Sequence, residues 1–263
     1  MAEIDLPAGL RRIGEEAFSG AGLAQVAVPA GVASISRSAF YRCERLSRVS
    51  LPEGLEAVGE SAFGGAGLAE ILIPASVRRV EAGAFGWCGR LEKVEFARGS
   101  RLEALGAGAF LQCVSLRKIT LPASLEAIPQ GCFSGAGLVE ISVPAGVQRI
   151  EETAFARCVN LQKVSFARNA QLREIGDGAF LECAALRALA LPAGLERLGA
   201  QGLAGTGVRK LELPAGIRSV GDGALARCPA LGKVAFARGA RPEALGRDLV
   251  AGSPGARIVG VPQ

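Results

Sequence analysis

The most reactive side chains in this 263-residue sequence are seven cysteines, and the sequence contains no histidine. Six cysteines lie three residues after a recurring Phe or Leu: Cys43, Cys88, Cys113, Cys158, Cys183 and Cys228. Their spacings of 45, 25, 45, 25 and 45 residues include no Cys-x-x-Cys pair, so the usual zinc-ligand spacing is absent. We predict buried thiols that fill space, Cys132 included. A disulfide remains the alternative for Cys88 with Cys113 and for Cys158 with Cys183, which lie one repeat apart.

The other chemistry-bearing groups point away from catalysis. Without histidine the chain lacks the commonest general base and the usual partner of a Ser or Cys nucleophile. Two carboxylate pairs, Glu15 with Glu16 and Glu151 with Glu152, occupy polar turn positions without a pocket to tune them. Glycine-rich fragments such as Gly20-Ala-Gly22 recur at one repeat position, which indicates shortened turns instead of phosphate cradles. We therefore expect no enzyme activity, cofactor or metal site.

A repeat positions all of these residues. An aromatic or aliphatic landmark follows Ala, or a residue in the same slot, at intervals of 22 to 25 residues: Phe18, Phe40, Phe63, Phe85, Phe110, Phe133, Phe155, Phe180, Leu203, Leu225 and Val250. The intervals themselves repeat every 70 residues, because every third unit has a longer connection, as in Phe96–Leu102 and Phe166–Leu172. The sequence therefore predicts eleven units organised in triplets.

Each unit predicts one coil of a solenoid. A segment such as Leu116–Leu121 alternates apolar and polar residues and indicates a short strand, which a proline such as Pro122 then ends. A second, shorter strand is expected at segments such as Leu125–Ile128 and Val147–Ile150, and the Ala-Phe pair begins a tight or 3₁₀ turn. Stacked coils would bury continuous columns, and we expect all eleven Phe side chains to point inward.

The motif L-P-x-x-L-x-x-I-G-x-x-A-F-x-x-C-x-x-L resembles the BspA-like branch of the leucine-rich-repeat proteins over essentially residues 1–263. The resemblance implies a leucine-rich-repeat solenoid, a horseshoe or rod, rich in β structure. Parallel strands, one per coil, would line the concave face, with short second strands and tight turns opposite. Members of that family commonly act in adhesion or as interaction surfaces. We expect a single domain over 1–263, uncapped at both ends because both termini enter or leave on a strand, as at Val259-Gly-Val-Pro262.

The expected binding surface is the outward side of the main strands, which repeat proteins commonly use. The candidate partner-binding residues are the cations of this face: Lys93, Lys118, Lys163, Arg187, Arg209, Lys210, Lys233 and Arg257. One interpretation is a self-compatible ladder in which Glu70 or Glu140 pairs with cations on neighbouring strands. The other is a basic strip, from Arg187 onward, that binds an acidic protein surface.

These observations favour a protein–protein interaction scaffold with a protein partner. The first alternative is a structural or adhesive array, as a monomer or associating end to end. The second is polyanion binding through Arg98, Arg168 and Arg238, which the lack of regularly spaced exposed aromatic residues disfavours for nucleic acid. The start of the sequence has no signal-peptide pattern and no run of about 18 apolar residues occurs, so we expect no membrane span and, by default, a cytoplasmic location.

Overall fold

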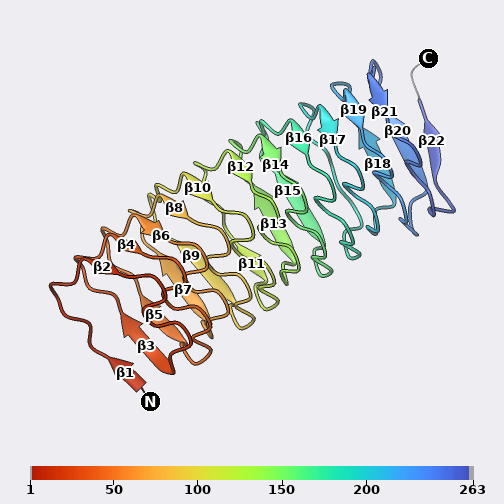
Figure 1. Ribbon diagram of the computed structural model, residues 1–263. Helices are drawn as coiled ribbons and strands as arrows, with labels where there is room; N and C mark the ends of the chain where they lie inside the picture. Colours follow the sequence, from red (N-terminus) through yellow and green to blue (C-terminus); the bar gives the residue numbers. More distant parts are fainter. Residues whose placement is uncertain (1, 261–263) are drawn as a thin grey trace. The chain divides into compact units, whose positions relative to one another are not determined.

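The computed structural model describes residues 2–260, which form β-strands joined by tight turns and contain no helix. The chain divides into two compact units, one comprising Met1–Leu125 and Gly135–Leu138 and the other Glu126–Ser134 and Val139–Gln263. Within each unit the chain coils repeatedly, and equivalent strands of neighbouring coils pair in parallel (Figure 1). The predicted β-rich solenoid with parallel strands is confirmed, with tight turns and no 3₁₀ helix in the described residues.

In the first unit the coils contribute main strands of two to five residues and second strands of two residues. The main strands are β1 (Ala2–Ile4), β3 (Leu23–Ala27), β5 (Arg48–Ser50), β7 (Glu70–Ile73), β9 (Lys93–Phe96) and β11 (Lys118–Ile119). The second strands are β2 (Arg12–Ile13), β4 (Ser34–Ile35), β6 (Ala57–Val58), β8 (Arg79–Val80) and β10 (Ala104–Leu105). The main strands form the sheets β1-β3-β5 and β7-β9-β11, and the second strands form one sheet from β2 to β10.

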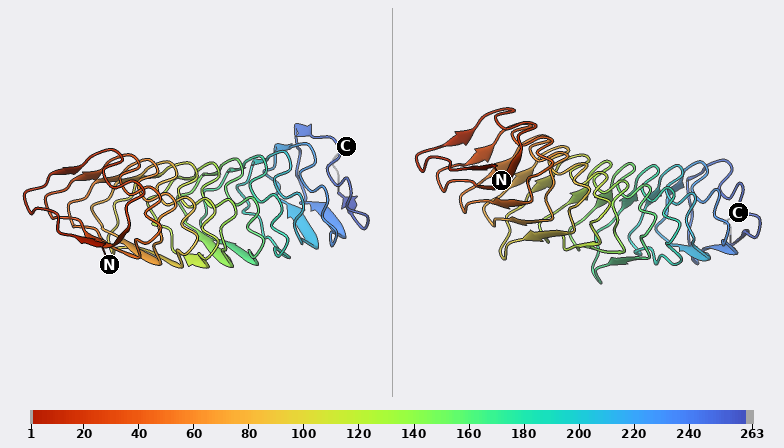
Figure 2. Two further views of the ribbon diagram at one scale, coloured as in Figure 1. Left: turned by 60° about the horizontal axis from the view of Figure 1, so that its bottom comes forward. Right: turned by 90° about the horizontal axis from the view of Figure 1, so that it is seen from below.

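The second unit repeats this plan. Its main strands are β13 (Glu140–Val143), β15 (Lys163–Phe166), β18 (Lys210–Leu213), β20 (Lys233–Phe236) and β22 (Arg257–Val259). Its second strands are β12 (Ala127–Ile128), β14 (Arg149–Ile150), β16 (Glu174–Ile175), β17 (Arg197–Leu198), β19 (Ser219–Val220) and β21 (Ala244–Leu245). Here the main strands form two sheets, β13-β15 and β18-β20-β22, and the second strands form one (Figure 2).

The main strands form where the sequence alternates between apolar and polar residues. In β7, Ile71 and Ile73 are buried whereas Glu70 and Leu72 are exposed, as the two-residue period of a strand requires. Pro74 then ends the strand because it has no N–H to continue the ladder. The N–H of Val77 donates to the Pro74 carbonyl (3.1 Å), which closes the turn toward the second strand.

Phenylalanine rings form the centre of both units. In the first unit the rings of Phe18, Phe40, Phe63, Phe85 and Phe110 stack with centroid distances of 5.2–5.6 Å. In the second unit Phe133, Phe155 and Phe180 stack at 5.4 and 5.2 Å. Neighbouring rings are nearly parallel, so each ring packs against the equivalent ring of the adjacent coil. The landmark Phe residues thus occupy the inward positions that the repeat predicts.

Of the eleven Phe side chains expected to point inward, eight are buried and three are less completely covered. Phe18, Phe96 and Phe166 are only half-buried. Among the described coils, Phe18 has a stacked ring on one side only. Phe96 and Phe166 are the last residues of β9 and β15, at the point where the chain turns out into the longer connection. Partly exposed aromatic surface therefore exists beside the main strands.

The turns are joined from coil to coil by backbone hydrogen bonds. The N–H of Phe40 donates to Ala62 (2.7 Å) and that of Arg42 donates to Gly64 (2.7 Å) in the next coil. Residues two positions before and after the landmark have positive φ, as in Ser38 (52°) and Arg42 (54°), which turns these N–H groups toward the neighbouring coil. The backbone conformation of each turn therefore directs its N–H groups to carbonyl groups of the next coil.

Candidate interaction surface

The cysteines hold the turns together. Cys88 Sγ lies 3.0 Å from the Phe63 carbonyl oxygen, and Cys158 Sγ lies 3.0 Å from the Phe133 carbonyl oxygen, so each thiol donates to the preceding coil. All seven cysteines are buried free thiols, as predicted. The hydrogen bond to the preceding coil gives these thiols a more specific role than filling space. Burial raises the pKa of Cys88 to about 12 and that of Cys183 well above its ordinary value. Raised thiol pKa values oppose nucleophilic chemistry at neutral pH.

Of the two carboxylate pairs, Glu151 and Glu152 accept hydrogen bonds from the preceding coil. Glu151 accepts a hydrogen bond from the backbone N–H of Gln130 (3.2 Å), and Glu152 accepts one from the Gln130 side chain (3.4 Å). Across residues 2–260, no group of three Cys, Asp or Glu side chains could hold a metal ion. No constellation for acid–base or nucleophilic catalysis emerges from these residues.

Charged residues are paired on the side of each unit that carries the second strands and the Phe-bearing turns, which we call the turn side. In the first unit Arg78 pairs with Glu103 (2.5 Å). In the second unit Arg173 and Arg218 both pair with Glu196 (2.5 and 3.3 Å). Four further pairs join turn-side residues of neighbouring coils: Arg37 with Glu60, Arg157 with Glu182, and Arg197 with Glu174 and Asp177. Part of the charge of the turn side is therefore compensated within each unit, whereas exposed arginines such as Arg42 and Arg79 form no ion pair with another described residue.

The outward side chains of the main strands, which we call the main-strand face, are arranged differently in the second unit. Lys210, Lys233 and Arg257 lie in register at the start of β18, β20 and β22, and all three are exposed. None of the three forms an ion pair with another described residue. Glu212 is the one acidic side chain in these three strands. The column is therefore a site of uncompensated positive charge.

The remaining predicted cations of the second unit lie near this column. Arg209 precedes β18, and its N–H donates to the Arg187 carbonyl of the preceding coil (3.3 Å). Lys163 begins β15 in register with Glu140. The side chains of Lys163, Arg187 and Arg209 are exposed. The structure thus brings Lys210, Lys233 and Arg257 into one ladder and places the other three cations outside it.

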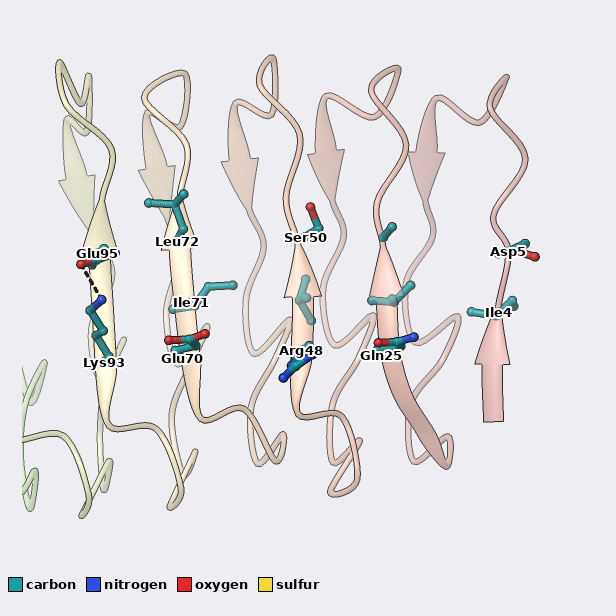
Figure 3. A pocket seen from close by; sticks show the side chains of 13 residues that line it. Ile4, Asp5, Gln25, Arg48, Ser50, Glu70, Ile71, Leu72, Lys93 and Glu95 are labelled. Carbon is teal, nitrogen blue, oxygen red and sulfur yellow. Dashed lines mark ion pairs between the residues drawn. The ribbon is translucent and has the colours of Figure 1, made fainter. Parts of the chain in front are cut away.

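In the first unit the main-strand face is partly self-compensated. Lys93 pairs with Glu95 along its own strand (2.8 Å), which corrects the expectation of pairing across strands with Glu70 (Figure 3). The reason is geometric, because Lys93 and Glu95 lie two residues apart and project from the same side of β9. Glu95, and to a lesser extent Glu70, raise the pKa of Lys93. Lys118 is in register with Lys93 and is exposed.

An open hollow of about 690 Å³ lies over the main strands β1 to β9 of the first unit, and Figure 3 shows the side chains that line it. Its polar lining includes Asp5, Gln25, Arg48 and Glu70, together with the Lys93–Glu95 pair, and Leu72 lies at its edge. Leu72 is 55% exposed, in a position where the neighbouring main strands carry Ser50 and Glu95. The sequence interpretation missed Leu72, although an apolar residue in an outward position of the strand pattern was a visible signal. Single exposed aliphatic side chains are common on protein surfaces, so the hollow as a whole, and not Leu72 alone, is the feature that could receive another molecule.

No helix within the described residues is long and apolar enough to span a membrane.

Two features of the main-strand face could engage another molecule. They are the cationic column of the second unit and the hollow with Leu72 in the first.

Comparison with protein families gives a match to the BspA-type leucine-rich-repeat region, in six copies over residues 1–102 and 103–232. Proteins with this repeat typically act in protein interactions or as surface repeat proteins, and they are generally non-enzymatic scaffolds. A comparison with curated proteins found no significant match.

Solved structures of bacterial leucine-rich-repeat proteins share the fold. A leucine-rich repeat protein from Eubacterium ventriosum matches with a TM-score of 0.58 and 19% identity, covering 99% of this chain and 84% of that one. The pneumococcal vaccine antigen PcpA matches with a TM-score of 0.53 and 17% identity, covering 92% and 72%. The T. pallidum leucine-rich-repeat protein TpLRR has a TM-score of 0.50 and 28% identity, covering 70% and 77%.

Proposed function

Because the chain belongs to the BspA-type leucine-rich-repeat family, we propose that it is a non-enzymatic protein-interaction scaffold that binds an acidic protein surface through its main-strand face. The observation that carries this proposal is the column of like charge on the main-strand face of the second unit. Lys210, Lys233 and Arg257 face solvent in register without an ion pair among the described residues, whereas several turn-side arginines, such as Arg173 and Arg197, pair with Glu or Asp.

Physical chemistry supports an acidic partner for this column. Like charges directly opposite each other on neighbouring strands disfavour the sheet, so this arrangement lowers stability slightly in the free protein. A carboxylate-rich surface would relieve that repulsion and would also accelerate association by electrostatic steering. The Debye length of about 8 Å at physiological ionic strength makes such binding sensitive to salt.

The test begins with the intact chain as bait, followed by affinity measurement with each captured protein. The double variant Lys210→Glu/Lys233→Glu should bind the true partner at least tenfold more weakly, and its affinity should depend less steeply on salt. The matched control is Arg45→Glu/Arg90→Glu, which makes the same charge change at two exposed turn positions. Equal affinities for the wild type and the main-strand variant would refute the proposal, whereas equal losses in both variants would show that only net charge matters.

A further inference from the structure

Two equivalent grooves lie beside the main strands, one in each unit. The Phe166 groove, of about 440 Å³, lies between Phe166, Ala167 and Arg168 on one side and Ala190, Pro192 and Ala193 on the other. The Phe96 groove, of about 670 Å³, lies between Phe96, Ala97 and Arg98 and the residues Thr120, Pro122 and Ala123. Each lining residue of the Phe166 groove lies 70 residues after a lining residue of the Phe96 groove, which is lined in addition by Leu72, Gly99 and Leu121. The long connection of the triplet repeat therefore produces the same groove twice.

The grooves open because the long connection leaves the sheet next to a weakly paired coil. The N–H of Ala97 donates to the Ile73 carbonyl (2.9 Å) of the preceding coil, after which the chain turns outward. In the following coil, β11 has only two residues, so its ladder with β9 ends at Ile119. In the second unit, Ala188–Leu191 joins neither the ladder of β15 nor that of β18. The end of the long coil is thus left uncovered on this side.

Both grooves combine an apolar floor with one cation. The half-buried rings of Phe96 and Phe166 supply aromatic surface, to which the Pro and Ala residues add aliphatic surface. The side chains of Arg98 and Arg168 are exposed, and neither forms an ion pair with a described residue. An apolar side chain in the groove would cover the ring while a nearby carboxylate reached the guanidinium.

The two grooves differ in one charge. Glu95 lines the Phe96 groove, and the equivalent position in the Phe166 groove is Ser165. Ser165 shares a hydrogen bond with Ser142 (2.9 Å), so this position adds no negative charge. The Phe166 groove is consequently the more attractive of the two for an anion.

We propose that these grooves bind an extended acidic segment of a partner protein that also carries aliphatic side chains, an aliphatic group packing on each Phe ring and a carboxylate pairing with Arg98 or Arg168. This inference rests on the proposed function and specifies the partner further. Lys163 and Arg168 lie near opposite ends of β15, with Ser165 and Phe166 between them. A segment that follows this strand meets a cation at both ends and an apolar groove beside the second. The acidic surface assigned to the scaffold therefore also needs apolar residues.

The probes are three fluorescein-labelled twelve-residue peptides that alternate Glu with Leu, Glu with Ser, or Lys with Leu, measured by anisotropy with the full chain. The Glu-Leu peptide should bind about tenfold more tightly than the Glu-Ser peptide, which is the ratio expected from burying one aliphatic side chain. The Lys-Leu peptide should not bind. Arg168→Glu should weaken Glu-Leu binding about tenfold and Arg98→Glu less, because Glu95 already disfavours anions there. Arg45→Glu is the matched control.

The outcomes separate the grooves from the scaffold. One outcome is that the Glu-Leu and Glu-Ser peptides bind with equal affinity, and that Lys210→Glu/Lys233→Glu weakens the binding of both while Arg168→Glu does not. This outcome overturns the groove proposal and leaves the proposed function standing. If neither acidic peptide binds, both ideas are overturned. A dye attached to Ala193→Cys should report Glu-Leu binding, whereas a dye on the exposed turn at Ala230→Cys should not. Both sites can be labelled selectively because the seven native thiols are buried.

Discussion

The turn side and the main-strand face are built from the same repeat, yet they satisfy their polar groups in different ways. On the turn side, thiols donate to carbonyl groups, arginines pair with carboxylates, and backbone N–H groups of one coil donate to the next. On the main-strand face the sheets are interrupted, and lysines and arginines remain without partners in the second unit. The difference indicates that the turn side provides stability and that the main-strand face is available for binding.

The largest test of this comparison uses two phenylalanines of the second unit. Phe155 is completely buried in the turn-side column, so Phe155→Ala should lower the free energy of unfolding by about 3–5 kcal/mol through lost burial and a cavity. Phe166 is half-buried beside the main strands, and Phe166→Ala should cost about half as much. Urea denaturation of both variants measures the difference. Equal losses would contradict the assignment of stability to the turn side.

A second test uses alkaline pH. Cys88 donates to the Phe63 carbonyl, and burial raises its pKa to about 12, compared with about 9 for a free thiol. Because the folded state holds the proton more tightly, the stabilisation is complete below pH 9 and is lost as the pH rises through 12. The free energy of unfolding should fall by about 1.4 kcal/mol per pH unit between these values because of Cys88 alone.

The control for the alkaline test is Cys88→Ala, which removes the titrating group. Its unfolding free energy should depend less on pH than that of the wild type over pH 9–12. A thiol reagent supplies an independent measurement, because the buried cysteines should react only on unfolding. Rapid labelling of Cys88 in the native protein, or identical pH profiles for the two proteins, would be inconsistent with a buried thiol that donates a hydrogen bond.

The repeat made the inner part of the molecule predictable, because a column position is set by sequence spacing. The landmark residues, spaced 22 to 25 residues apart, predicted the length of the coil, the stack of Phe rings and the burial of the cysteines. The thiol bond to Phe63 could not be anticipated, since it depends on how far neighbouring coils are displaced. The expected extent and single-domain organisation over 1–263 remain a prediction.

The surface was less predictable, because side-chain pairing depends on the local path of the backbone. The register of Lys210 with Lys233 followed from the repeat and is confirmed. The repeat spacing placed Ile258 in the next position of this column, whereas the structure places Arg257 opposite Lys233 and Ile258 opposite Val234. Pairing of Lys93 with Glu95 did not follow, because the choice between a neighbour on the same strand and one across the sheet depends on side-chain conformation. The grooves depend on where the ladder stops, which the alternating pattern of Leu116–Leu121 does not reveal. Whether the eight predicted cations bind a partner stays a prediction.

The smallest and most selective test reverses one charge on each side of the second unit. Arg197 bonds to Glu174 and lies 3.4 Å from Asp177, and these carboxylates raise its pKa. Arg197→Glu would place three carboxylates together and should lower the free energy of unfolding by about 1 kcal/mol, since exposed pairs contribute little individually. Lys210→Glu should change it by less than about 0.5 kcal/mol, and in the stabilising direction, because Glu would then face Lys233.

Thermal unfolding at low and moderate salt compares the two variants. The destabilisation by Arg197→Glu should shrink with added salt, as expected for exposed charges. If Lys210→Glu were the more destabilising variant, Lys210 would have to be compensated inside the molecule, and its availability to an acidic partner would no longer follow. If Lys210→Glu instead leaves the protein stable but weakens binding of the acidic partner, the two sides of the coil have different roles. The same charge reversal would then lower stability at Arg197 on the turn side and weaken recognition at Lys210 on the main-strand face.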